Sequence, residues 1–180
     1  MKHSNIHIIA YILMAIVGIS FSACSDDTTS TYSNKNPVRC DFFVLQYKEL
    51  FDVINNNGQF ATIRKSAAQL KMKSAVNETT YNMEAAQKYF QFGLGGLIVG
   101  TTYAGEYRVY DLSCPNCNRA EKRMTIDDNG YAKCGNCKIS YNLNNDGIIT
   151  DVPKECIHSN PRSLLRYKIA YDGQYVHIYN

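Results

Sequence analysis

Two Cys-x-x-Cys pairs decide the fold: Cys114-Pro115-Asn116-Cys117 and Cys134-Gly135-Asn136-Cys137, separated by residues 118–133. A Cys-x-x-Cys turn places two sulfur atoms on one side of a tight loop and directs backbone N–H groups at the thiolates. Proline, glycine and asparagine suit such tight backbone. We expect the two loops to lie on neighbouring hairpins and to bring the four sulfur atoms together.

A metal-binding cage made of Cys114, Cys117, Cys134 and Cys137 is the main prediction. The spacing of the four cysteines lies within the range of zinc ribbons, and four thiolates in a tetrahedron suit zinc or iron. Disulfides are an alternative if the protein is exported to an oxidising compartment. A thioredoxin-type redox pair is a further alternative, but residues 118–121 and 138–141 read as turn and strand, not as the start of a helix.

The sequence around the cysteines predicts an all-β domain. Short runs of β-branched and aromatic residues alternate with turn signals such as Asn129-Gly130, Asp146-Gly147 and Asp172-Gly173. The expected strands are 42–45, 60–63, 94–103, 107–112, 131–133, 165–171 and 175–179. This pattern is typical of a sandwich or barrel. Residues 65–88 lack a clear period, and we expect a short helix or a mobile surface loop there.

The N-terminus predicts export. Lys2 precedes an apolar segment from Ile8 to Phe21, which is shorter than the about 17–25 residues that span a bilayer. A charged start, a short apolar centre and small residues before a cleavage point are typical of a signal peptide. We expect the signal peptide at 1–23, a flexible tether rich in Ser, Thr, Asp and Asn at 24–36, and one domain at 37–180.

Ser22-Ala23-Cys24 resembles the lipobox of bacterial lipoproteins, although Phe21 stands where Leu is usual. This resemblance implies that Cys24 carries the lipid, palmitate included, and that the protein is held at the outer membrane. Cys24-Ser25-Asp26-Asp27 is also similar to a short tag that sends some lipoproteins to the cell surface. An ordinary secretory signal or a short membrane anchor is the alternative.

The flanks of the cysteine pairs, Gly95-Gly96-Leu97, Asp111-Leu112-Ser113 and Tyr141-Asn142-Leu143 among them, resemble the Rieske-like lipoproteins of Gram-negative bacteria. The resemblance covers about 38–180 and is best from Gly95 onward. It implies an antiparallel Rieske-type β-fold, with a small rubredoxin-like subdomain at about 112–145 holding a [2Fe–2S] cluster. It also implies electron transfer with a redox partner that the sequence does not name.

The ligand set departs from this family. Rieske sites use two cysteines and two histidines, whereas here Cys117 and Cys137 occupy the histidine places, and Ile139 replaces a serine that bonds to the cluster. A [2Fe–2S] cluster with four thiolates would have a potential near that of plant-type ferredoxins, roughly −400 mV. Alternatively, the two matched loops suit one tetrahedral ion, and zinc there would be structural. Cluster and single ion, iron or zinc, stay open at this point.

The remaining signals are weak. Cys40 and Cys156 are expected to be buried thiols or a disulfide, and His158 and His177 surface or half-buried side chains. No nucleophile, base and orienting group can be assembled, so we do not expect the protein to be an enzyme on its own. Nineteen basic and sixteen acidic residues give a net charge of +3 in 180 residues, which does not indicate nucleic-acid binding.

Overall fold

The computed structural model describes residues Tyr32–Asn180. The expected signal peptide and the lipidation site Cys24 lie outside the described residues. Within Tyr32–Asn180 no helix is long and apolar enough to cross a membrane.

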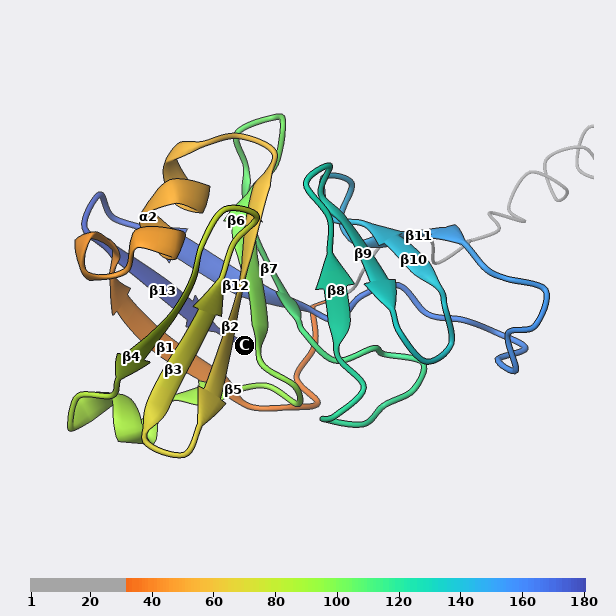
Figure 1. Cartoon of the computed structure of the whole chain (residues 1–180), viewed down its shortest axis with the longest axis horizontal. Coiled ribbons are helices and arrows are strands. Elements are labelled where there is room, and N and C mark those ends of the chain that lie inside the picture. Colours follow the sequence, from red (N-terminus) through yellow and green to blue (C-terminus); the bar gives the residue numbers. More distant parts are fainter. Residues whose placement is uncertain (1–31) are drawn as a thin grey trace, which may run out of the picture.

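The described chain is mostly β and forms two antiparallel sheets, so the predicted β class is confirmed (Figure 1). The larger sheet has the strand order β4-β3-β2-β6-β7-β12-β13-β1-β5. Its strands are β1 (Val38–Phe43), β2 (Gln59–Ser66), β3 (Gln69–Lys73), β4 (Glu78–Asn82), β5 (Gln91–Phe92), β6 (Leu97–Thr101), β7 (Tyr107–Asp111), β12 (Arg166–Tyr171) and β13 (Tyr175–Tyr179).

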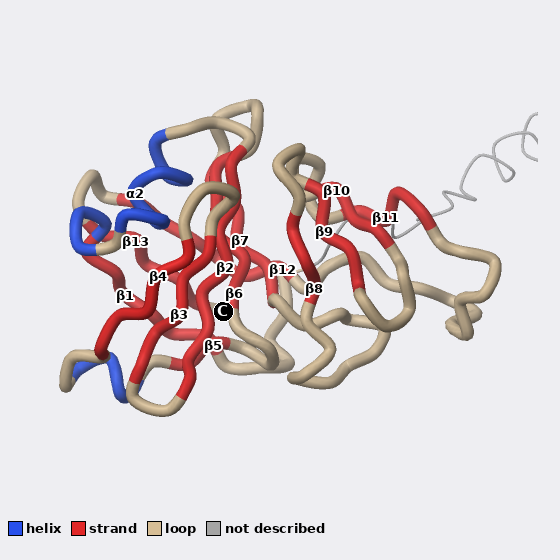
Figure 2. Tube along the Cα trace, in the orientation of Figure 1, coloured by secondary structure: helices blue, strands red, loops and turns tan. Residues whose placement is uncertain are grey.

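The smaller sheet is inserted between two strands of the larger one. Its order is β11-β10-β9-β8, with β8 (Met124–Ile126), β9 (Tyr131–Cys134), β10 (Ser140–Asn142) and β11 (Ile148–Asp151). The chain enters it after β7 and leaves it before β12, and β7 and β12 pair directly with each other. Figure 2 shows the two sheets side by side, with long loops at the far end of the smaller one.

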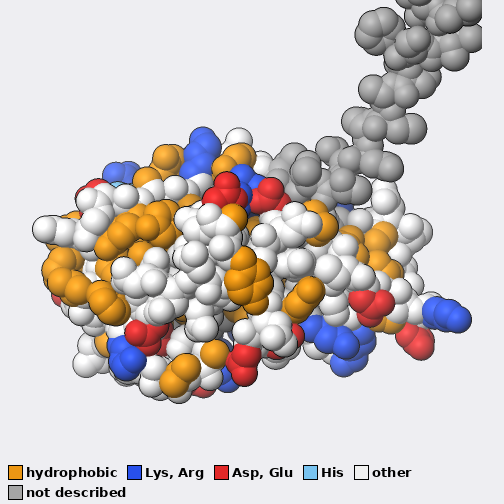
Figure 3. Space-filling model, turned by 90° about the horizontal axis from the view of Figure 1, so that it is seen from above, with side chains coloured by type: hydrophobic (Ala, Val, Ile, Leu, Met, Phe, Trp, Pro, Cys, Tyr) orange, Lys and Arg blue, Asp and Glu red, His pale blue; other side chains and the backbone are white. Residues whose placement is uncertain are grey.

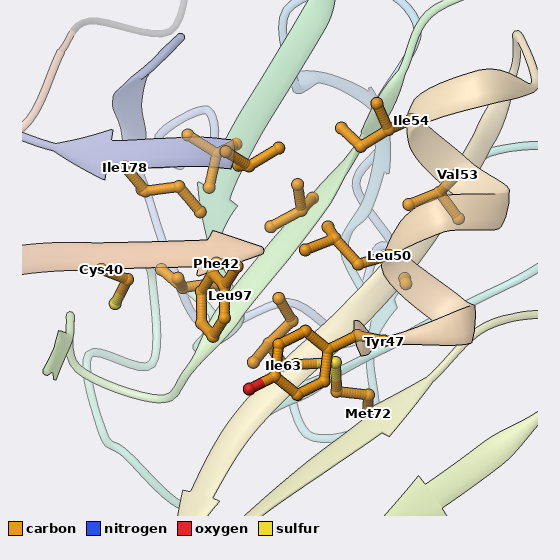
Figure 4. Close-up of a cluster of buried hydrophobic side chains, with 14 of the residues drawn as sticks. Cys40, Phe42, Tyr47, Leu50, Val53, Ile54, Ile63, Met72, Leu97 and Ile178 are labelled. Atoms are coloured by element: carbon orange, nitrogen blue, oxygen red, sulfur yellow. The ribbon is translucent and has the colours of Figure 1, made fainter. Parts of the chain in front are cut away.

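The larger sheet curls around one apolar core. Phe42 on β1, Leu70 on β3 and Val109 on β7 all belong to the same buried cluster, although these strands are far apart in the sheet order. Alternate residues of β1 are buried, as period-two strands with one covered face require. The helix α2 (Lys48–Asn55) closes this core by inserting Leu50 and its neighbours (Figure 4).

A second core joins the two sheets. Phe60 and Tyr110 of the larger sheet pack with Leu143 and other buried residues of the inserted segment. The Tyr110 hydroxyl donates a hydrogen bond to the Leu143 carbonyl at 2.9 Å, which satisfies a buried polar group. At the edge of this core, Arg108 and Arg166 both contact Asp146, at 2.8 and 2.5 Å.

Three local expectations were wrong. Most of residues 65–88 are strand: they contribute the end of β2 and the strands β3 and β4, and the only helix in this stretch is a single 3-10 turn, η2 (Ala86–Tyr89). The predicted strand 42–45 ends at Phe43, and the chain then turns through the 3-10 helix η1 (Val44–Gln46) into α2. The expected strand 94–103 is shorter, because β6 begins only at Leu97.

The end of the expected tether packs against the domain. Ser33 is buried, and its N–H donates to the Arg166 carbonyl at 2.8 Å. The Arg166 guanidinium lies 4.5 Å from the centre of the Tyr32 ring, and Asn180 donates to the carbonyl of Asn36 at 2.7 Å. The described part of 24–36 therefore belongs to the folded unit.

Candidate metal centre

Each cysteine pair follows a strand. Cys114 comes three residues after the end of β7, and Cys134 is the last residue of β9, so its pair forms the turn of the β9–β10 hairpin. The N–H of Cys134 bonds to the Ile139 carbonyl at 3.0 Å, and the N–H of Cys114 bonds to the Lys122 carbonyl at 2.9 Å. Both loops are thus closed by backbone hydrogen bonds.

The two loops repeat one backbone conformation. The N–H of Asn118 bonds to the Cys114 carbonyl at 2.9 Å, and the N–H of Lys138 bonds to the Cys134 carbonyl at 3.0 Å. Asn118 and Lys138 both have left-handed backbone, with φ of 50° and 62°. Asparagine tolerates this region, so Asn118 carried a readable signal. Lysine has no such preference, so the sequence does not indicate that Lys138 adopts left-handed backbone.

Glycine is not required by the second loop. A Cβ at Gly135 would meet no atom within 4 Å, and its φ is not in the left-handed region. Pro115 holds the equivalent place in the first loop, where its ring demands a negative φ. The expectation that Gly135 serves a tight backbone was therefore wrong, and the left-handed residue comes three places later.

The four sulfur atoms meet as predicted. All four Sγ atoms lie within 4.8 Å of one another; Cys114 Sγ is 3.6 Å from Cys137 Sγ, and Cys117 Sγ is 3.7 Å from Cys134 Sγ. A zinc–sulfur bond of about 2.3 Å gives a regular tetrahedron with edges of about 3.8 Å. The group fits a single tetrahedral ion such as zinc or iron.

Backbone N–H groups favour thiolates in both loops. Burial raises the pKa of Cys134, but hydrogen bonds from the N–H groups of Cys137 and Asn136 lower it, and the net result is a pKa below the ordinary value. The same arrangement recurs at Cys114, which accepts from the N–H groups of Cys117 and Asn116, yet there burial dominates and the pKa is raised. Burial also raises the pKa of Cys137. Cysteine binds a metal as the thiolate, so a bound cation would compensate the negative charge gathered in this group.

A buried tyrosine contacts the first loop. The Tyr141 hydroxyl lies 3.6 Å from Cys114 Sγ and accepts a hydrogen bond from the Asn116 amide at 2.8 Å. Its own proton is left free to bond to the sulfur. The Asn116 carboxamide also bonds both backbone groups of Arg162, which ties the first loop to the chain that leads into β12. Outer contacts of this kind orient metal ligands.

A buried carboxylate fixes the approach to the first loop. Asp111 is fully buried and accepts five hydrogen bonds. Its oxygens receive the N–H groups of Leu94, Gly95 and Ser113, the Ser113 hydroxyl and the Tyr167 hydroxyl. Sequence reasoning missed this role, although an aspartate at the end of an apolar strand is itself a signal.

The cage is nearly closed to solvent. Cys114 and Cys134 are fully buried, Cys137 is buried, and only Cys117 is half-buried. The Asn136 amide lies 3.4 Å from the sulfur of Cys117 on this open side. With all four coordination positions taken by sulfur, the group can hold an ion but offers no place for a substrate.

The other predicted residues lie apart from the cage. All six described cysteines are free, so the disulfide alternatives do not form, whether within the pairs or between Cys40 and Cys156. Cys40 packs in the core of the larger sheet and Cys156 beside the second core. His158 and His177 are half-buried, as expected, and neither belongs to the sulfur group.

No protein-family model, curated protein or solved structure matches the chain.

Proposed function

We propose that this protein is a lipid-anchored envelope protein whose β-domain is pinned by one tetrahedral Zn²⁺ ion bound to Cys114, Cys117, Cys134 and Cys137. The observation that carries the metal assignment is the mutual approach of the four Sγ atoms, all within 4.8 Å. In a [2Fe–2S] cluster two of the four thiolates bind each iron, with bridging sulfides between the irons. Thiolates on different irons must then stand farther apart than thiolates on one ion.

Zinc in this cage would act on stability. The inserted segment has only short strands of three or four residues, and small sheets need additional stabilisation. A structural zinc site supplies an apparent binding free energy of about 10–16 kcal/mol, which becomes folding free energy when the unfolded chain has no site. The ion would join the loop after β7 to the hairpin of β9 and β10.

The resemblance to Rieske-like lipoproteins remains part of the proposal. It is supported by a small antiparallel sheet with two metal-binding loops, inserted between two paired strands of a larger antiparallel sheet. The contact between Tyr141 and Cys114 also agrees with the aromatic position of that family. The compact sulfur group argues for a member that has exchanged its cluster for a single ion.

Electron transfer through a single iron is the second candidate. Cys117 is half-buried and so brings one ligand close to the surface, where an electron could leave or enter. Hydrogen bonds to the sulfur atoms, such as those from the N–H groups of Asn136 and Cys137 to Cys134, tune the potential of iron–sulfur centres.

Metal content and colour distinguish these candidates. We would purify the full chain without oxygen, record its visible spectrum and measure zinc, iron and sulfide. One zinc per chain and no colour are expected. One iron with a reversible one-electron couple would support the second candidate, and two irons with two sulfides per chain would refute a single ion. Cys117→Ser should lose metal, whereas the matched variant Cys156→Ser should keep it.

The anchor has its own test. Cells fed labelled palmitate should label the wild-type protein and not Cys24→Ala, and protease added to intact cells should digest the protein if it is displayed outside. Labelling that survives the loss of Cys24 would refute lipidation at this residue, whatever the metal content.

A further inference from the structure

A cleft of about 260 Å³ lies between the two sheets, away from the cysteine cage. One wall is the outward face of β2 and β3, and the other is β8 with the turn that follows it. Its floor is apolar and consists of Phe60, Leu112, Met124 and Ile126. The first three of these are buried and belong to the second core, so the floor is preformed.

The wall on the larger sheet carries an unusual pair of cations. Arg64 on β2 and Lys71 on β3 stand directly opposite each other in the antiparallel register, and both are half-buried. Like charges directly opposite on one sheet face destabilise the pairing. Neither side chain has an acidic partner among the described residues.

The remaining charges of the cleft do not neutralise this pair. Lys73 has a loose ion pair with Glu78 at 3.6 Å, and Asp127 uses an oxygen to accept the N–H groups of Asn129 and Tyr131. Arg123 is a further cation at the rim. The lining therefore holds four cations and two acids. Figure 3 shows one face of the molecule, on which charged side chains of both signs lie among hydrophobic and other side chains.

We propose that this cleft binds a small organic carboxylate with an apolar body. The carboxylate would accept hydrogen bonds from Arg64 and Lys71, and the hydrocarbon would cover Phe60 and Met124. Guanidinium and ammonium groups bind carboxylates through charge-assisted hydrogen bonds, and these strengthen where water is partly excluded. An apolar floor with a few convergent polar groups is the usual form of a small-molecule site.

This site goes beyond the proposed metal function and does not depend on which ion the cage holds. The cleft floor and the cage share the second core: Leu112 lies two residues before Cys114, and Met124 pairs with Cys134 in the β8–β9 register. Occupation of the cleft would bridge the two sheets, so we also expect the ligand to raise the melting temperature of the protein.

Titration calorimetry with three probes of equal chain length tests the proposal: octanoate, octan-1-ol and octylammonium. The full chain should bind octanoate in preference to the other two, and added salt should weaken this binding because the attraction is ionic. In the double variant Arg64→Gln/Lys71→Gln, octanoate affinity should fall at least tenfold. The matched variant Lys154→Gln/Lys168→Gln removes two exposed charges elsewhere and should bind like the wild type.

Three outcomes would overturn the proposal: no octanoate binding at millimolar concentration, equal binding of octan-1-ol, or unchanged affinity in the Arg64 and Lys71 variant. Circular dichroism and metal content of the same samples show whether each variant is folded and loaded. A failed metal prediction and a failed cleft prediction are thereby told apart.

Discussion

Replacement of Asp111 by asparagine tests how the approach to the metal loop is held. Oδ1 of Asp111 accepts the N–H groups of Gly95 and Ser113 and the Ser113 hydroxyl, and Oδ2 accepts the Leu94 N–H and the Tyr167 hydroxyl. An amide has one acceptor oxygen. Its best orientation keeps the oxygen at the Oδ1 place and turns its NH₂ toward Tyr167, whose hydroxyl can rotate and accept.

The N–H of Leu94 cannot adapt in this way and is left facing an NH₂ group. Leu94 is half-buried, so its unpaired donor costs at most about 1–3 kcal/mol, and the remaining hydrogen bonds lose the contribution of the charge. We expect Asp111→Asn to lower the free energy of unfolding by about 2–4 kcal/mol. Because Ser113 precedes the proposed ligand Cys114, metal affinity should fall by about 10–100-fold as well.

Urea unfolding at saturating zinc, followed by the fluorescence of the tyrosines in this tryptophan-free chain, measures the first effect. Competition with a zinc indicator measures the second. Asp128→Asn is the matched control, since Asp128 is exposed in the turn before β9, and its change should stay within about 0.5 kcal/mol. A loss below about 1 kcal/mol for Asp111→Asn would refute the reasoning, because the five hydrogen bonds would then carry little weight.

Three further predictions concern the cage, the joint between the sheets and the C-terminal hairpin. When a chelator removes the metal from the wild-type protein, amides in β8–β11 should lose protection from hydrogen exchange before those of the larger sheet. Equal loss in both sheets would contradict a local stabilising role for the metal. Gly147→Ala should cost at least about 1 kcal/mol in urea unfolding, because φ is 69° and the new Cβ would lie 2.8 Å from Leu164 Cβ; an unchanged midpoint would disprove this. Hydrogen bonds from the His177 ring to the carboxylates of Asp41 and Asp172 raise the pKa of His177. Its contribution to stability is therefore full below about pH 6.5 and is lost as pH rises through the raised value. In His177→Gln the free energy of unfolding should therefore differ less between pH below about 6.5 and pH above the raised pKa than in the wild type. An unchanged pH dependence of this free energy would count against the interaction.

The cysteine cage and the turns could be predicted because local sequence determines them. A Cys-x-x-Cys loop needs only a few residues to point two sulfurs the same way, and Asp172-Gly173 does form the turn of the last hairpin, with φ of 98° at the glycine. The strand β13 was visible because its buried and exposed residues alternate, and β7 because it is a short run rich in aromatic and β-branched residues.

What could not be predicted depends on partners distant in sequence. Residues 69–82 have few β-branched residues, and they become strands because β2 offers an open edge to β3, which then pairs with β4. The helix α2 is short, and no side chain caps its N-terminus, so little in the local sequence marks it. Its Glu49 can be buried because Thr79 and Tyr81 of β4 donate hydrogen bonds to its carboxylate. The Arg64–Lys71 opposition likewise exists only once the register is known.

The pairing of β1 with β13 has a consequence for the order of events in the cell. The first strand of the domain lies between β5 and the last strand, so one of its edges stays unpaired until the final residues of the chain are available. Contacts that span nearly the whole domain are slow to form. In a chain that emerges N-terminus first from the ribosome or a membrane pore, β1 cannot pair with β13 until the C-terminal residues have emerged. If the protein is exported as we propose, this delayed closure would prevent the chain from completing its native sheet before it has crossed the membrane.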